Sequence, residues 1–103
     1  MKILVVISSK EPENAWNAFR LASLAADKKD EVTVFLLNSG VECLKDVGKH
    51  NVKTISEQFA QKGGKLLACG TCVKSRSLGD VCPISNMETL YSLIKECDKA
   101  VYL

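Results

Sequence analysis

Two thiols three residues apart, Cys69 and Cys72, are the side chains of this sequence best suited to chemistry. They follow a short apolar run, so Cys69 is expected at the carboxyl end of a buried parallel strand, where α/β folds place their reactive groups. Gly70 and Thr71 would begin a helix, and the amide groups at a helix start favour a thiolate, the reactive form of sulfur. The sequence therefore predicts that Cys69 and Cys72 are catalytic residues.

Two basic residues, Lys74 and Arg76, follow the thiol pair closely. Their positive charge would favour a thiolate and would attract an anionic sulfur donor. Together with Gly70 and Thr71 they are the predicted substrate-binding residues. The two cysteines are one helical turn apart, which in principle is close enough for a disulfide. The alternative interpretation is that both cysteines are small buried hydrophobic residues.

The other three cysteines are weaker candidates for chemistry. Cys97 falls on the apolar stripe of the last predicted helix and Cys43 at the edge of a shorter one, so both are interpreted as structural. Cys82 belongs to the loop Asp80-Val81-Cys82-Pro83, which could fold over the same crevice and bring a third thiol near the pair. It would then have a resolving or relaying role, or else it packs at the edge of the core.

A metal site built from Cys69, Cys72, Cys82 and His50 is a further alternative. Structural zinc sites usually show two closely spaced ligand pairs, whereas this sequence has one pair, one cysteine ten residues later and one distant histidine. We therefore predict no metal and no cofactor, and we expect His50 to be an exposed loop residue.

The size and composition of the chain indicate one globular domain over residues 1–103, with 47% hydrophobic and 25% charged residues. A net charge of +2 is too small to indicate a nucleic-acid or membrane partner, so neither is predicted. The five cysteines are an odd number, and no secretion signal is recognisable, so the thiols are expected to be reduced and the protein cytoplasmic.

Apolar runs predict strands at 3–7, 32–37, 66–68 and 99–103, with a short fourth strand near 81–84 that Pro83 would confine to an edge. Helices are predicted between them, at 12–27, 41–48, 54–62, 73–78 and 86–97. The third and fifth would begin with capping boxes at Thr54 and Ser85. One apolar face of the last would consist of Met87, Leu90, Tyr91, Ile94 and Cys97.

Strands that alternate with helices predict a three-layer α/β/α fold with a mainly parallel sheet of about five strands. The first helix carries more apolar surface than one sheet face needs, including Trp16, Leu21 and Leu24. We therefore expect part of it to pack against another subunit.

In this order of elements and in its motifs, the sequence resembles the DsrE/DsrF-like family of small sulfur-trafficking proteins, a relative of flavodoxin-like folds. The resemblance spans the chain and is carried by Lys2 to Ile7, Pro12 to Ala26, Val32 to Leu37 with Gly40-Val41, and above all Leu67 to Arg76. It implies that Cys69 matches the family's persulfide carrier and that Cys72 matches a second cysteine found in a subset of members. It also implies a homo-oligomer, a trimer or hexamer.

Three functions follow as hypotheses. The first is sulfur trafficking, in which Cys69 accepts sulfane sulfur as a persulfide from a donor protein and passes it to a thiol of an acceptor protein. The second is a dithiol-disulfide oxidoreductase that uses the same pair, although thioredoxin-like proteins place their motif early in the chain and after an aromatic residue. The third is a non-catalytic subunit of a sulfur-relay oligomer, which the presence of Cys69 disfavours.

Overall fold

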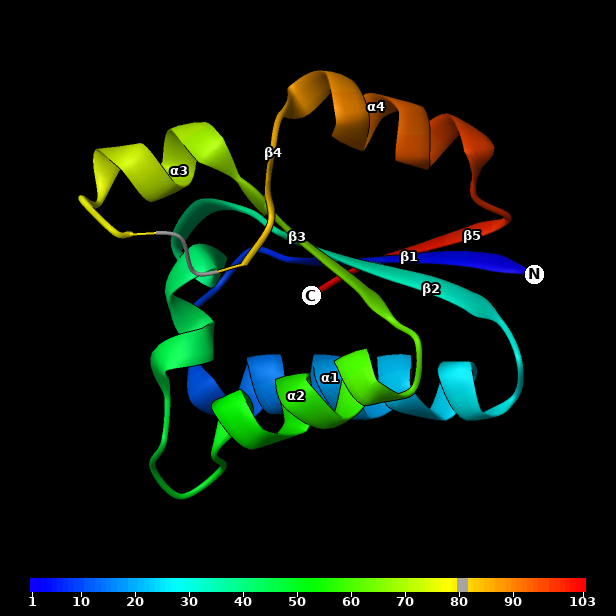
Figure 1. Cartoon of the computed structure of the whole chain (residues 1–103), viewed down its shortest axis with the longest axis horizontal. Coiled ribbons are helices and arrows are strands. Elements are labelled where there is room, and N and C mark those ends of the chain that lie inside the picture. The colour runs from blue at the N-terminus through cyan, green and yellow to red at the C-terminus, as the bar shows by residue number, and fades with distance from the viewer. Residues whose placement is uncertain (80–81) are drawn as a thin grey trace.

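Five parallel strands form one sheet at the centre of the molecule, in the order β4-β3-β2-β1-β5 (Figure 1). The structure is a computed structural model that describes residues 1–79 and 82–103. Four of the five strands lie within one residue of their predicted bounds, which confirms the parallel sheet. The bounds are β1 (Lys2–Ile7), β2 (Glu31–Leu36), β3 (Lys65–Cys69), β4 (Ile84–Ser85) and β5 (Lys99–Tyr102).

Helices cover both faces of this sheet, as predicted for a three-layer α/β/α fold. Helices α1 (Pro12–Asp27) and α2 (Val52–Gln61) lie on one face, and α4 (Met87–Glu96) lies on the other (Figure 1). The 3₁₀ helix η1 (Asn38–Lys45) follows β2, and the short helix α3 (Gly70–Ser75) follows β3. Both therefore begin at the carboxyl edge of the sheet, beside one another.

The sheet separates two hydrophobic clusters, because successive side chains of a strand point to opposite faces. Ala68 faces the larger cluster and Cys69, the next residue, faces the smaller one. The larger cluster packs under α1 and α2 and includes Val5, Val34, Phe19, Phe59 and Cys43. The smaller cluster packs under α4 and consists of Leu4, Val6, Phe35, Cys69 and Leu90, with partly buried neighbours that include Leu67, Cys72 and Cys97.

The predicted capping boxes were wrong, because asparagines cap both helices. Asn51 precedes α2 and its side-chain oxygen accepts a hydrogen bond from the Thr54 amide at 3.2 Å. Asn86 precedes α4 and accepts one from the Thr89 amide at 2.8 Å. Asparagine is among the preferred N-cap residues, so each helix begins at the residue after it.

The two short helices also begin earlier than predicted, directly after the strands that precede them. The 3₁₀ helix η1 ends at Lys45, so Val47 lies beyond it and is exposed. A side chain at Gly40 would place its Cβ 2.1 Å from the carbonyl oxygen of Ile7, so only glycine allows η1 to approach β1 this closely. Helix α3 begins at Gly70, which agrees with the helix start expected at Gly70 and Thr71 but not with the range 73–78, and Cys69 is its N-cap residue.

The buried side of α4 differs from the predicted stripe. Leu90 is its buried residue, and Leu93 and Cys97 pack beside it against the smaller cluster. Met87, Tyr91 and Ile94, which belong to the predicted apolar face, are exposed. The residues at the buried side are spaced three and four apart, as are those of the predicted stripe, so spacing alone could not choose between them.

The remaining predictions concern the edge strand β4 and the exposed surface of α1. Strand β4 is an edge strand next to Pro83, as predicted, but it begins at Ile84, so residues 82 and 83 of the predicted strand precede it and residue 81 lies outside the described residues. Leu21 and Leu24 of α1 are exposed, which agrees with the excess of apolar surface expected there. Among the described residues, no helix is both long enough and apolar enough to cross a membrane.

Candidate functional site

Cys69 is the last residue of β3 and lies at the carboxyl edge of the sheet, as predicted. Its side chain belongs to the smaller core cluster, and only 3% of the residue is exposed. It occupies the N-cap position of α3, but its side chain makes no capping hydrogen bond within the described structure. The Gly70 and Thr71 amides, which were predicted to stabilise a thiolate, therefore follow Cys69 in the chain without a hydrogen bond from its side chain to the helix start.

Cys72 lies one turn further along and is only half-buried. Its Sγ accepts a hydrogen bond from the backbone amide of Asn38, at 3.3 Å. Burial raises the pKa of Cys72 above its ordinary value, and a hydrogen bond with the Cys69 side chain raises it further. The Asn38 amide and the Arg76 guanidinium oppose this rise, because both stabilise the thiolate. The two thiols thus lie together, and Cys72 holds its proton more firmly than an ordinary cysteine.

Arg76, predicted to bind substrate, is held at the end of α3 by three contacts. Its Nε donates to Oε2 of Glu42 at 3.2 Å, and its Nη1 donates to the carbonyl oxygen of Cys72 at 3.3 Å. Nη1 also lies 3.4 Å from the hydroxyl of Ser75. The guanidinium is therefore beside Cys72, as the sequence predicted, but a carboxylate shares its charge.

The other predicted binding residues face a separate depression. Gly70, Thr71 and Lys74 line a cleft of about 410 Å³ between α3 and β4, together with Ile84 and Ser85. A Cβ at Gly70 would lie 2.9 Å from Cγ2 of Ile84, so glycine lets β4 approach the start of α3. Neither thiol lines this cleft, whose exposed lysine offers a positive charge to a molecule that approaches from this side.

Cys82 packs with Cys43 against the larger core cluster, whereas Cys69 belongs to the smaller one. Burial raises the pKa of Cys82 to about 11. Burial raises the pKa of Cys43 to about 12, and the neighbouring Cys82 contributes to this rise. Cys72 packs against both clusters and so lies between these two sets of thiols.

The alternative metal site is not assembled in the described part of the chain, where no three cysteine, histidine or acidic side chains are grouped to hold an ion. His50 was expected to be exposed, but it is partly buried against Trp16, with the ring centroids 5.1 Å apart. Cys97 donates to the carbonyl oxygen of Ile94 at 3.4 Å and packs at the edge of the smaller cluster, which agrees with a structural role.

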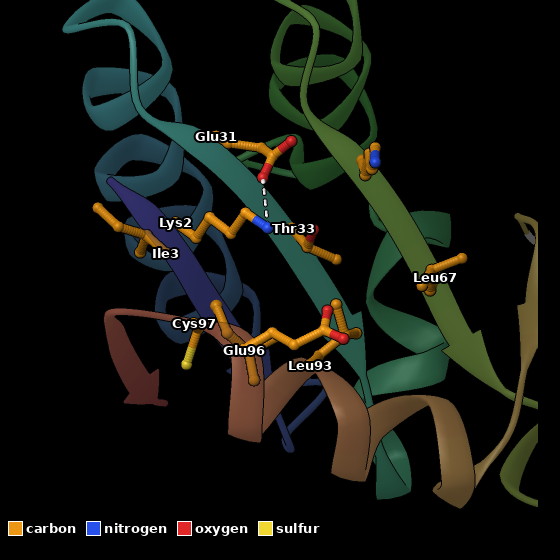
Figure 2. Close-up of a pocket in the computed structure, with 10 residues that line it drawn as sticks. Lys2, Ile3, Glu31, Thr33, Leu67, Leu93, Glu96 and Cys97 are labelled. Atoms are coloured by element: carbon orange, nitrogen blue, oxygen red, sulfur yellow. Dashed lines mark ion pairs between the residues drawn. The ribbon is translucent and has the colours of Figure 1, made fainter.

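A second cleft, of about 250 Å³, opens between α4 and the sheet (Figure 2). Lys2, Glu31 and Lys65, the first residues of β1, β2 and β3, line it. Figure 2 shows Lys2 directed towards Glu31, and these side chains form an ion pair of 3.9 Å. The cleft is thus at the amino ends of the strands, whereas Cys69 ends β3, so it contains none of the predicted site residues.

Sequence reasoning missed two residues of the thiol site, Asn38 and Glu42. Both come from η1, which follows β2 and meets α3 at the carboxyl edge of the sheet. Loops that follow adjacent parallel strands gather at this edge, and this rule is the signal that could have found them. The sequence separation of 34 residues in each contact hides the pairing from any local motif.

The fold and the site define a class of protein: a small three-layer α/β/α domain with a dithiol where its third strand ends. The sequence profile of the DsrE/DsrF-like family matches residues 1–103, and the chain belongs to this family.

Relatives and solved structures agree over nearly the whole chain. The uncharacterized protein MK0008 of Methanopyrus kandleri is 29% identical, over 97% of this chain and 93% of its own. The uncharacterized protein MJ0989 of Methanocaldococcus jannaschii is also 29% identical, over 98% of both chains. The ychN protein of E. coli has the same fold, with a TM-score of 0.83 at 19% identity over 100% of both chains. A conserved protein of Bacteroides thetaiotaomicron, BT1422, has a TM-score of 0.82 at 15% identity over 99% of this chain and 94% of its own.

Proposed function

We propose that this protein traffics sulfur inside the cell, with Cys69 as the carrier of a persulfide and Cys72 as its partner. Membership of the DsrE/DsrF-like family supports a role in sulfur relay. The observation that carries the proposal is the placement of both thiols at the carboxyl edge of the sheet, where buried Cys69 belongs to the smaller core cluster and half-exposed Cys72 packs against it.

The transfer needs no oxidant or cofactor. The Cys69 thiolate attacks the outer sulfur of a donor persulfide, an S–S bond forms to Cys69, and the donor thiolate leaves. An acceptor thiolate then attacks the outer sulfur of the Cys69 persulfide. The outer sulfur becomes a persulfide on the acceptor, and Cys69 is released as a thiolate. Alternatively, the Cys72 thiolate attacks the inner sulfur, so that hydrosulfide leaves and a Cys69–Cys72 disulfide forms. In that step the sulfane sulfur is reduced and the two cysteine sulfurs are oxidised.

The burial of Cys69 suits a carrier. A persulfide enclosed by the smaller core cluster is shielded from free thiols in solution, which would otherwise remove its outer sulfur. Access for the donor and the acceptor is then from the side of Cys72, the more exposed thiol. Lys74, exposed on the same short helix, offers a positive charge to an anionic donor.

The test is to incubate the reduced protein with a persulfide donor and to measure its mass. We expect a gain of about 32 Da, one sulfur atom, located on Cys69 by peptide mapping. Cys69→Ser should lose this adduct, and Cys72→Ser should retain it for longer than the unaltered protein. Cys97→Ser, which alters a half-buried thiol outside the pair, is the matched control. An unaltered protein that gains no sulfur on either Cys69 or Cys72 would exclude the carrier function.

A dithiol-disulfide oxidoreductase is the second candidate, because the contact between the two thiols also favours a reversible disulfide. Here the pair would exchange electrons with a substrate disulfide and carry no extra sulfur. Turnover of a model disulfide by the reduced protein, with a reduction potential in the usual cellular range, would favour this function. Failure of both assays would leave the role of a non-catalytic subunit.

We also propose that the chain acts in the cytoplasm as a homo-oligomer, a trimer or hexamer, which meets its donor and acceptor proteins. The exposed Leu21 and Leu24 on α1 support an interface between subunits. Light scattering coupled to gel filtration gives the mass in solution, and a monomer at micromolar concentration would exclude this assembly. Leu24→Lys should lower the mass, and Lys28→Ala, an exposed residue beyond the helix, should not.

A further inference from the structure

Cys72 is surrounded by polar and charged groups from three separate elements. Asn38 contributes its amide from the start of η1, Cys69 contributes its thiol from the end of β3, and Arg76 approaches from the C-cap position of α3. Glu42, also from η1, faces Cys72 only through Arg76. Lys74 lines the cleft on the β4 side, which neither thiol lines.

The ion pair of Arg76 with Glu42 differs from the other ion pairs of the described structure in its surroundings. Its two side chains are 31% and 32% exposed, whereas each of the other pairs includes a side chain that is 49% exposed or more. The same guanidinium is bound to the Cys72 carbonyl, so it cannot swing into solution without breaking two contacts. Charges that are partly buried and fixed in this way are screened by salt less than mobile surface charges.

We propose that Glu42 is a positioning residue of the thiol site: it anchors the Arg76 guanidinium beside Cys72 and neutralises it, so that Cys72 remains a thiol. This inference rests on the proposed carrier function, because it assigns the persulfide to Cys69 and a slow resolving reaction to Cys72. Cys72 remains a thiol, and it attacks a Cys69 persulfide only slowly.

The proposal predicts changes of opposite sign at the two ends of the ion pair. Glu42→Gln leaves the guanidinium without its counter-charge, which favours the thiolate of Cys72. Arg76→Gln removes the positive charge itself, which favours the thiol. A purely structural ion pair predicts the same direction for both variants, since each breaks the same link between η1 and α3.

The experiment follows the alkylation of Cys72 by iodoacetamide between pH 6 and 10, with the two cysteines resolved by tandem mass spectrometry. We expect the midpoint for Cys72 to move to lower pH by about 0.5 to 1 unit in Glu42→Gln and to higher pH by a similar amount in Arg76→Gln. Glu57→Gln, which removes one exposed carboxylate from α2, is the matched control and should leave the midpoint unchanged. Circular dichroism and thermal unfolding check that each variant folds.

Equal directions of shift in the two variants, or no shift in a folded Glu42→Gln protein, would overturn the proposal. A second measurement connects it to function: with a persulfide on Cys69, sulfide release should be faster in Glu42→Gln and slower in Arg76→Gln. The two readouts separate the possible failures. If no persulfide forms on the unaltered protein, the carrier function fails, while the alkylation profile still decides the role of Glu42.

Discussion

Cys69 and Cys72 differ in their surroundings, although one helical turn separates them. Cys69 ends a central strand and is enclosed by the smaller core cluster, whereas Cys72 is half-buried and receives the Asn38 amide. Their contact raises the pKa of Cys72, which already rises through burial. The attack that would release sulfide needs the Cys72 thiolate, so the raised pKa of Cys72 favours an intact persulfide on Cys69.

The first residue-scale prediction concerns the pH dependence of this release. The thiolate fraction of Cys72 increases about tenfold with each pH unit below its pKa, and that pKa is raised. Sulfide release from the persulfidated protein should therefore be slow near pH 7 and should accelerate as the pH increases. Methylene blue detection of sulfide gives the rate, and Cys72→Ser should lose the pH dependence. A rate that is flat between pH 6 and 9 would contradict this prediction.

The second concerns Cys43, whose pKa of about 12 leaves about one thiol in 10⁵ ionised at pH 7. The residue is also 1% exposed, so reagents cannot reach it in the folded protein. We expect Cys43 to remain unmodified by iodoacetamide at pH 7.5 while Cys72 reacts, and to react fully in guanidinium chloride. Peptide mapping checks both states. Native modification of Cys43 as fast as that of Cys72 would show that η1 opens readily.

At the scale of elements, the caps and the short helices decide how the thiol site is built. Asn51 begins α2 with a backbone φ of 55° and a side-chain hydrogen bond to Thr54, and Gly40 lets η1 pack against the end of β1. Since η1 supplies both Asn38 and Glu42, its close approach to the sheet brings these residues to α3. The geometry around Cys72 thus depends on residues that take no part in chemistry.

Asn51→Ala should destabilise the protein by about 1 to 2 kcal/mol, because it removes the capping acceptor and places alanine in a left-handed conformation. Asn51→Gly tests the two causes separately, since glycine adopts this conformation freely and should cost only a few tenths of a kcal/mol. Urea unfolding followed by circular dichroism measures both variants. If both lose the same stability, the backbone conformation of residue 51 contributes nothing.

The sequence predicts strands far better than helix starts and faces. Apolar runs such as 3–7 have no other suitable place than the sheet interior, so their strands lie within one residue of prediction. Thr54 and Ser85 matched a capping box as well as Asn51 and Asn86 match an N-cap, and only packing against the sheet decides between them. The buried side of α4 depends in the same way on which strands it covers.

In the thiol site, too, the features set by one short segment were predicted, whereas contacts between residues far apart in the sequence were not. The placement of Cys69, the proximity of Cys72 and the position of Arg76 follow from one continuous segment, and they were predictable. The contacts of Asn38 and Glu42 join residues 34 positions apart, and they require the strand order. Cys82 also depends on the strand order, because the connection into β4 brings it to the side of the larger cluster.

For the whole molecule, the two faces of the sheet are unequally protected. Helices α1 and α2 cover the larger cluster, whereas α4 and the short α3, whose Cys72 packs against it, lie over the smaller cluster that encloses Cys69 (Figure 1). Leu90 is the one described residue of α4 that is fully within this cluster. The shielding of Cys69 on this face therefore depends largely on Leu90 of α4, with the short helix α3 beside it.

Leu90→Ala should lower the free energy of unfolding by about 2 to 4 kcal/mol, because it leaves a cavity under α4. The same cavity opens the smaller cluster, so Cys69 should be alkylated faster and a persulfide on it should be removed sooner by glutathione. Tyr91→Ala is the matched control: this side chain is 61% exposed on the same helix and should change stability by less than about 0.5 kcal/mol. Urea unfolding and peptide-resolved alkylation measure the two effects. If Leu90→Ala is destabilised but Cys69 keeps its alkylation rate, α4 does not shield the thiol and access is controlled from the Cys72 side alone.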